Sequence, residues 1–269
     1  MSAVEGLTKI PELRRRILYT LGLLAVYRVG CHIPVPGVNT QTLARFFQGN
    51  ENTLFGMLNM FSGSALENAS IFALGIMPYI SASIIFQLLT VVWPYLAALQ
   101  KEGELGRQKI NQYTRYATVV ISFVQGTGIT SVLIAADGGS FVYSGGWQFR
   151  VLAIITLTAG TAFIMWLGEQ ISEFGIGNGI SLIIFAGIVA NMPGAVFMFL
   201  VDVGDGTRPL LDIFIVLPIV FFVVYAIIYV ERAYRKIPIQ HARRVIGRRM
   251  YGGASTHLPL KVNTAGVIP

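Results

Sequence analysis

Charged side chains are scarce in this sequence. Only 12% of its 269 residues are Asp, Glu, Lys or Arg, whereas 54% are hydrophobic. An average soluble domain carries about a quarter charged residues, so this chain has too little polar surface to cover its apolar side chains in water. The composition excludes an ordinary soluble globular protein and predicts that most of the chain lies in lipid.

Metal-binding and nucleotide-binding patterns are also missing. Cys31 is the single cysteine, which excludes an internal disulfide framework and a multi-cysteine zinc site. His32, His241 and His257 are scattered along the chain and predict no metal site. The sequence contains no G-x-x-x-x-G-K-[ST] motif, which excludes nucleotide hydrolysis through a P-loop. We expect neither a metal nor a cofactor.

Long apolar stretches are present instead. A bilayer core about 30 Å thick needs roughly 20 apolar residues in a helix. Six spans are predicted, at 17–33, 68–97, 116–136, 150–168, 180–201 and 212–230. Arg28 interrupts the first span, and we expect its side chain to reach toward the outer membrane surface. The expected fold is an all-α membrane protein, a polytopic bundle of six transmembrane helices.

Lys and Arg are distributed unevenly between alternating loops. Sixteen of the 20 lie in one set, which consists of the amino terminus (1–16), a basic loop (98–115), a short turn (169–179) and a second basic loop (231–261). The other set holds four. Because cytoplasmic loops carry the excess of positive charge, the amino terminus is predicted to be cytoplasmic.

Two loops are more than simple connections. Residues 53–64 form a short apolar piece that is too short to span a bilayer, so it is either an interfacial amphipathic helix or a re-entrant half-helix. Loop 231–261 contains eight basic residues and one acidic residue. Such a loop is typical of the cytoplasmic side near anionic lipid, and it also suits docking on an acidic or RNA-rich partner.

Isoleucines recur at helical spacing within two of the spans. Ile76, Ile80 and Ile84 are four residues apart, as are Ile180 and Ile184, so each set lines one helix face. Such faces serve as packing or lipid-facing surfaces, or they form a hydrophobic constriction that blocks ions by dewetting. The charge-free span interiors are compatible with both.

Five motifs resemble one family. They are SIFALGIMPYI (70–80), NMFSG (59–63), NQYTR (111–115), EFGIGNG (173–179) and GRRMYGG (247–253). All five are similar to the SecY family, the central subunit of the bacterial Sec protein-conducting channel. The likeness extends from PELR at 11–14 to the carboxyl end.

The resemblance implies roles for particular residues. Residues 53–64 become a re-entrant plug half-helix that closes the resting pore, and span 68–97 lines the pore and one side of the lateral gate. The implied plug residues are Thr53, Leu54, Phe55, Met57, Leu58, Asn59, Met60, Phe61, Ser62 and Gly63. The implied pore ring is Ile76, Ile80, Ile180 and Ile184. The implied docking residues for the ribosome or an ATPase are Arg243, Arg244, Arg248 and Arg249.

The same resemblance implies a channel and not an enzyme. It would translocate unfolded secretory proteins across the cytoplasmic (inner) membrane of a bacterium and insert membrane proteins into it. The implied partners are the SecE and SecG subunits, the SecA ATPase, the ribosome, signal sequences, unfolded polypeptides and membrane lipid, with no DNA. The family has ten spans in two inverted halves, and residues 262–269 resemble the start of the seventh. We therefore expect a fragment of a longer channel.

Two other functions remain open at this point. The chain is also compatible with half of a small-solute secondary transporter that has a broken helix near 53–70, although such a carrier would need coupling residues within the membrane. It is compatible as well with a membrane anchor whose basic loop recruits a cytosolic partner. The anchor predicts no functional sensitivity at the isoleucines.

Overall fold

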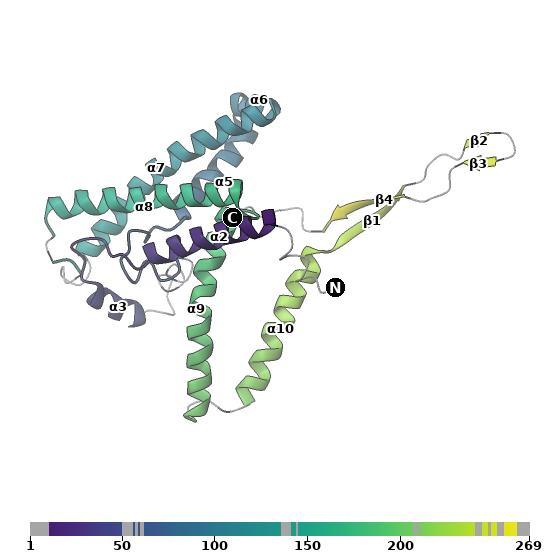
Figure 1. Cartoon of the computed structure of the whole chain (residues 1–269). Coiled ribbons are helices and arrows are strands. Elements are labelled where there is room, and N and C mark those ends of the chain that lie inside the picture. The colour runs from purple at the N-terminus through teal and green to yellow at the C-terminus, as the bar shows by residue number, and fades with distance from the viewer. Residues whose placement is uncertain are drawn as a thin grey trace. The chain divides into compact units, whose positions relative to one another are not determined.

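The computed structural model describes residues 11–49, 56, 59, 62–135, 141–143, 145–206, 209, 211–239, 244–246, 249–251 and 256–262. The chain divides into two compact units, Met1–Ala195 and Val196–Pro269. Helices dominate the described residues (Figure 1). They are α2 (Pro11–Gly30), α3 (Thr40–Gly49), α5 (Met77–Val92), α6 (Pro94–Lys101), α7 (Glu104–Ala135), α8 (Trp147–Phe174), α9 (Gly179–Gly204) and α10 (Leu211–Glu231).

Four of these helices, α7 to α10, are long and apolar enough to cross a membrane, and a fifth crossing results if α5 and α6 are one bent span. The predicted fold class, an all-α membrane protein, is confirmed. Helix α2 is not among the four. It begins at Pro11, six residues before the predicted span, and each 18-residue stretch of it contains the Arg14, Arg15 and Arg16 triplet as well as Arg28.

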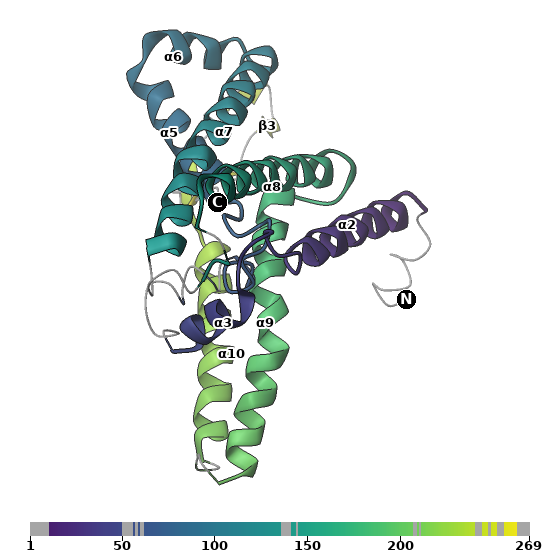
Figure 2. The ribbon, with the colours of Figure 1, turned by 90° about the vertical axis from the view of Figure 1, so that its left-hand side faces the viewer.

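The region predicted as a span at 68–97 is not one helix. Residues 62–76 run as successive turns, and α5 starts only at Met77. Pro78 lies in the first turn of α5, where its missing N–H costs nothing, so it starts the helix and does not kink it. Trp93 is extended (φ −97°, ψ 114°) because it precedes Pro94. The pair α5 and α6 is bent there by 97°, and α6 lies beside α7 (Figure 2).

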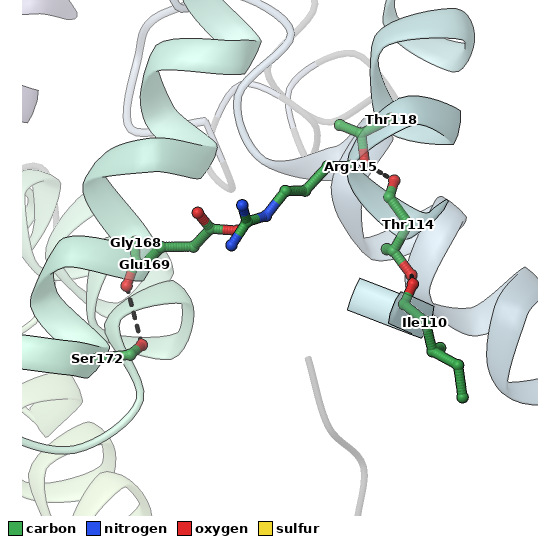
Figure 3. A network of polar contacts seen from close by, with 7 residues as sticks. All are labelled: Ile110, Thr114, Arg115, Thr118, Gly168, Glu169 and Ser172. Atoms are coloured by element: carbon green, nitrogen blue, oxygen red, sulfur yellow. Dashed lines mark hydrogen bonds and ion pairs between the residues drawn. The ribbon is translucent and has the colours of Figure 1, made fainter. Parts of the chain in front are cut away.

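Helices α7 and α8 make the most extensive helix contact in the first unit. The buried face of α7 carries only small or hydroxylated side chains, namely Gly106, Thr114, Thr118, Ser122, Gly126 and Thr130. The hydroxyls of Thr114 and Thr118 donate to the carbonyls of Ile110 and Thr114, at 3.0 and 2.7 Å (Figure 3). Each hydroxyl is therefore satisfied within its own helix, and the small side chains let α8 approach closely.

Loop 231–261 forms a β-ribbon in the second unit. Strand β1 (Tyr234–Ile239) pairs antiparallel with β4 (Thr256–Lys261), and β2 (Arg244–Ile246) pairs with β3 (Arg249–Tyr251) beyond it (Figure 1). The register sets Ile237 opposite Leu258 and Arg235 opposite Leu260. Apolar and other residues alternate in β4, where Leu258 and Leu260 are separated by Pro259, but not in β1, where Arg235 and Lys236 are adjacent.

Gly160 of α8 and Gly30 of α2 leave space for the turn segment 62–76 to pack against these two helices. The Ile71 carbonyl oxygen lies against Gly160 of α8, so closely that a Cβ at Gly160 would overlap it. The Phe72 ring lies in the same way against Gly30 of α2. Phe72 also stacks on Phe163 at a centroid distance of 6.0 Å. The segment therefore depends on the absence of side chains at two places in the surrounding helices.

Gly160→Ala should destabilise the protein because the new Cβ meets backbone, which cannot move aside as a flexible side chain can. We expect a loss of about 1 to 3 kcal/mol, the usual cost of overpacking. Thermal unfolding in detergent measures it. Gly128→Ala on α7 is the matched control, since no heavy atom lies within 4 Å of a Cβ there. Equal melting temperatures for Gly160→Ala and the control would contradict this packing.

Candidate functional site

The candidate site is the turn segment 62–76, which passes between helices without being helical. Ten of its residues are buried, namely Ser62, Gly63, Ala65, Ala69, Ser70, Phe72, Ala73, Leu74, Gly75 and Ile76. The Val35 amide donates to the Ala69 carbonyl at 2.8 Å, and the Ile71 amide donates to the Ile33 carbonyl at 2.9 Å. Non-helical backbone at membrane depth is tolerated only inside protein or along a water-filled cavity, so such a segment in a membrane protein marks a functional region.

Helix α2 holds the beginning of this segment through two side chains. The Arg28 guanidinium donates from Nη1 to the Gly63 carbonyl at 2.7 Å. The Tyr27 hydroxyl donates to the Ser62 carbonyl at 3.4 Å. The Arg28 side chain is thus bound to a backbone carbonyl 35 residues further along the chain, while its expected reach toward the outer membrane surface stays a prediction.

Helix α9 contacts the same residues. Gly63 lies against Gly187, where a Cβ at Gly63 would be 2.9 Å from the Gly187 Cα. The Ser64 hydroxyl donates to Oδ1 of Asn191 at 3.2 Å. Gly63 and Ser64 both have left-handed backbone, with φ of 67° and 65°. This conformation costs a non-glycine residue free energy, so the contacts with α2 and α9 must stabilise it at Ser64.

Most of the predicted plug, including Thr53, Leu54, Phe55, Met57, Leu58, Met60 and Phe61, lies outside the described residues. Asn59, Ser62 and Gly63 are described. The Asn59 side chain donates to the Glu67 carboxylate at 3.1 Å and accepts from the Glu67 amide at 3.0 Å. The Ser62 hydroxyl donates to the Asn59 carbonyl at 2.9 Å. Asn59 is thus joined to the start of the turn segment.

The four isoleucines of the predicted ring belong to one hydrophobic cluster. Ile76 and Ile180 are buried in it, while Ile80 and Ile184 are half-buried and pack against it. Ile76 comes directly before α5 and Ile80 lies in its first turn, whereas Ile180 and Ile184 lie at the start of α9. Ile164, Leu167 and Ile171 of α8 and Ile183 of α9 are buried in the same cluster. The structure thus brings together residues that are about 100 positions apart in the sequence.

Two of the four predicted docking arginines belong to described strands of the ribbon. Arg244 belongs to β2 and Arg249 to β3, where Arg249 is paired with Ile246. Arg243 and Arg248 lie outside the described residues. In the described part of the chain, no group of three or more His, Cys, Asp or Glu side chains is arranged to hold a metal ion.

Some polar contacts of the first unit join segments predicted to be cytoplasmic, and another joins two loops predicted to be on the outer side. Arg115 of α7 pairs with Glu169 of α8 at 2.6 Å (Figure 3), and the Tyr19 hydroxyl of α2 donates to Gln170 at 3.2 Å. All four residues lie in or next to segments predicted to be cytoplasmic. The Asn39 amide donates to the Phe141 carbonyl at 2.8 Å, which joins the two loops predicted to be on the outer side. The contacts agree with alternating helix directions.

Sequence reasoning missed Tyr27, Gly187 and Asn191 as contacts of the turn segment. Nothing in the local sequence of α9 indicates that Gly187 and Asn191 meet residues more than 120 positions earlier. Arg28 did carry a signal, because a single charge within an apolar stretch requires a partner. Its partner is a backbone carbonyl, which no side-chain pattern reveals.

Comparison with known proteins identifies relatives for nearly the whole chain. A model of the SecY family matches residues 70–269. The chain is 52% identical over 259 residues to the protein translocase subunit SecY of Escherichia coli, covering 96% of this chain and 58% of that protein. It is 48% identical over 268 residues to the protein of the same name from Vibrio cholerae, covering 100% and 60%. The chain thus spans less than two thirds of the length of these relatives.

Solved structures agree in fold. One described as a protein conducting channel has a TM-score of 0.59 at 21% identity and covers 97% of this chain and 58% of its own. Sec61 in a canine ribosome-channel complex has a TM-score of 0.55 at 20% identity, with coverage of 94% and 58%. A third, concerned with the plug domain of SecY in the closed channel, has a TM-score of 0.58 at 21% identity, with coverage of 97% and 57%. From its sequence and its fold, the chain belongs to the SecY family.

Proposed function

We propose that this chain builds part of a protein-conducting pore in the cytoplasmic membrane of a bacterium, the function that its relatives' names describe. The observation that carries the proposal is the buried turn segment 62–76, which ends in the isoleucine cluster of α5 and α9. A bundle that served only as an anchor would have no need of buried non-helical backbone. The relatives are longer than this chain, so a complete pore would need segments that correspond to their remaining length.

An aliphatic ring suits a conduit for polypeptides. A translocating chain presents side chains of every chemistry, so strong binding sites along its path would stop it. Ile76, Ile80, Ile180 and Ile184 offer no hydrogen bond and no charge, and a narrow apolar ring excludes ions by dewetting. The half-buried pair, Ile80 and Ile184, has side-chain surface left over for such a role.

The exposed face of α5 suits a lateral gate toward lipid. Ile84, Ile85 and Leu88 are 47%, 46% and 64% exposed on this helix. Signal sequences are apolar helices, and they would partition between pore and lipid by transfer free energy, at about 25 cal/mol per Å² of buried apolar area. Pore and bilayer would thus compete for each segment according to its hydropathy.

The plug is proposed for residues 53–64, whose last three residues are also the first three of the turn segment. The bonds from Tyr27 and Arg28 to the carbonyls of Ser62 and Gly63 would fix the end of the plug in the resting state. The plug domain of the solved SecY channel described above supports this role. Opening would require that these contacts break or move with the plug.

The basic ribbon is proposed to face the cytoplasm and to bind the ribosome or the SecA ATPase, which supplies the energy for movement. Its eight basic residues and the positive-inside distribution support this. The canine Sec61 channel, to which this chain is similar in fold, was solved with a ribosome. SecE and SecG are proposed as membrane partners.

Replacing Ile80 and Ile184 with Ser should raise the resting ion leak several-fold, because hydroxyls let water wet the ring. The test uses a chimera in which this chain is joined to the remaining part of the Escherichia coli relative. Conductance in planar bilayers is measured. Ile219→Ser with Ile228→Ser is the matched control, since both residues are exposed on α10. A leak no greater than that of the control would remove the ring assignment.

Arg28→Gln should also increase resting conductance in the same chimera, because the Gly63 carbonyl loses a charge-assisted bond worth about 1.5 to 3 kcal/mol. Arg28→Lys should restore part of the seal, since Lys keeps the charge. Arg150→Gln, which removes an exposed Arg from the first turn of α8, is the control. If Arg28→Gln and Arg150→Gln conduct alike, Arg28 does not hold the plug.

Charge reversal of Arg248 and Arg249 to Glu should weaken ribosome binding and flatten its dependence on salt. We expect the slope of log affinity against log salt to fall by about one per arginine. Arg235→Glu with Lys236→Glu makes the same charge change at the near end of the ribbon. Binding of purified ribosomes is measured from 50 to 200 mM salt. Over this range the affinity of a protein that makes about 6 to 10 phosphate contacts falls strongly. If the slope of log affinity against log salt is the same for the two double variants, docking does not depend on Arg248 and Arg249 in particular.

A further inference from the structure

An apolar cavity lies in the first unit, apart from the isoleucine cluster. Its volume is about 170 Å³. It is enclosed by α3, the turn segment, the end of α7 and the start of α8. Its wall includes Leu43, Phe47, Ala73, Ile129 and Ala153. These elements meet in the layer of contacts that joins the two loops predicted to be on the outer side.

The wall of the cavity excludes water as an occupant. All fourteen described lining side chains are Ala, Val, Leu, Ile or Phe. A buried water needs two to four polar partners, and apolar cavities of about 150 Å³ stay dry and take up benzene or xenon instead. The chemistry of this cavity therefore selects hydrocarbon.

Hydrogen bonds hold the cavity open. The Val35 amide donates to the Ala69 carbonyl at 2.8 Å, and the Asn39 amide donates to the Phe141 carbonyl at 2.8 Å. Between them, Gly37 has a left-handed φ of 92° and lies against the Phe149 ring. Because these bonds fix the backbone on the α3 side, the wall cannot collapse by a simple movement of that loop.

The mouth of the cavity opens beside a membrane-spanning helix. Of the fourteen lining side chains, Val132 and Phe46 are the exposed ones, at 54% and 37%. Val132 lies near the end of α7, and Val120, Phe123 and Val124 are exposed on the same helix. In the membrane this surface borders acyl chains, so the mouth is continuous with the lipid-facing side of α7.

We propose that this cavity binds the end of one acyl chain of a membrane lipid. The chain end would enter past Val132 and Phe46 and fill the space against Ala153 and Leu43. The gain would come from apolar surface that the lipid buries and from contacts that an empty wall lacks. Occupancy requires only that the protein lies in a bilayer, and conduction plays no part in it.

The test uses the whole 269-residue chain in nanodiscs that contain a phospholipid whose acyl chain ends in a trifluoromethyl group. Fluorine NMR should show one resonance shifted from the bulk lipid signal, with about one bound chain per protein. Ala153→Leu should abolish it by filling the cavity from α8. Ala195→Leu, at an exposed position of α9, should leave it unchanged.

Val132→Trp is a second variant, chosen because Val132 is exposed and its replacement leaves the core intact. It should also remove the resonance by closing the mouth. Three outcomes would overturn the proposal. They are a wild-type spectrum with the bulk signal alone, a shifted resonance that persists in both cavity variants, and uptake of xenon by a protein that shows no shifted lipid signal.

Discussion

The structure depends on one constraint, the satisfaction of buried backbone that is not helical. In a helix each amide finds its carbonyl four residues away, but the turn segment 62–76 has to find many of its partners elsewhere. Arg28, Val35 and Ile33 supply them from α2 and the residues that follow it. In lipid an unsatisfied peptide group costs several kcal/mol, so these bonds decide whether the segment can lie in the core.

Other features of the bundle follow from the same segment. The Ile71 carbonyl occupies the place that a Cβ of Gly160 would take, and the Gly187 Cα lies where a Cβ of Gly63 would be too close. Helix α5 begins at Met77 and not at residue 68, where the span was predicted to begin, because residues 68–76 belong to the turn segment. Ile76 and Ile80 then lie in one hydrophobic cluster with Ile180 and Ile184 of α9.

Hydropathy and charge were sufficient to predict the class of fold. Except for Ala136, which lies outside the described residues, the apolar stretches at 116–136, 150–168, 180–201 and 212–230 fall within helices α7 to α10, because lipid leaves an apolar chain of that length few alternatives to a helix. The turn segment was not predicted, since its composition is that of a span and its partners are distant in sequence. The β-ribbon was not predicted, because the many basic residues of 231–261 indicated a cytoplasmic loop and its strands are short. The Arg28 bond was missed because its acceptor is a carbonyl.

The threonine hydroxyls on the buried face of α7 affect how this helix can move against α8. Thr114, Thr118 and Thr130 bond to their own helix, so the described interface between α7 and α8 is joined by shape and by a single polar link, Arg115 to Glu169. A small shift of α7 along α8 therefore breaks no hydrogen bond until that ion pair is stretched. The interface is held by packing and by one ion pair near its end. The two helices can therefore shift along each other while their hydroxyl groups keep their hydrogen bonds.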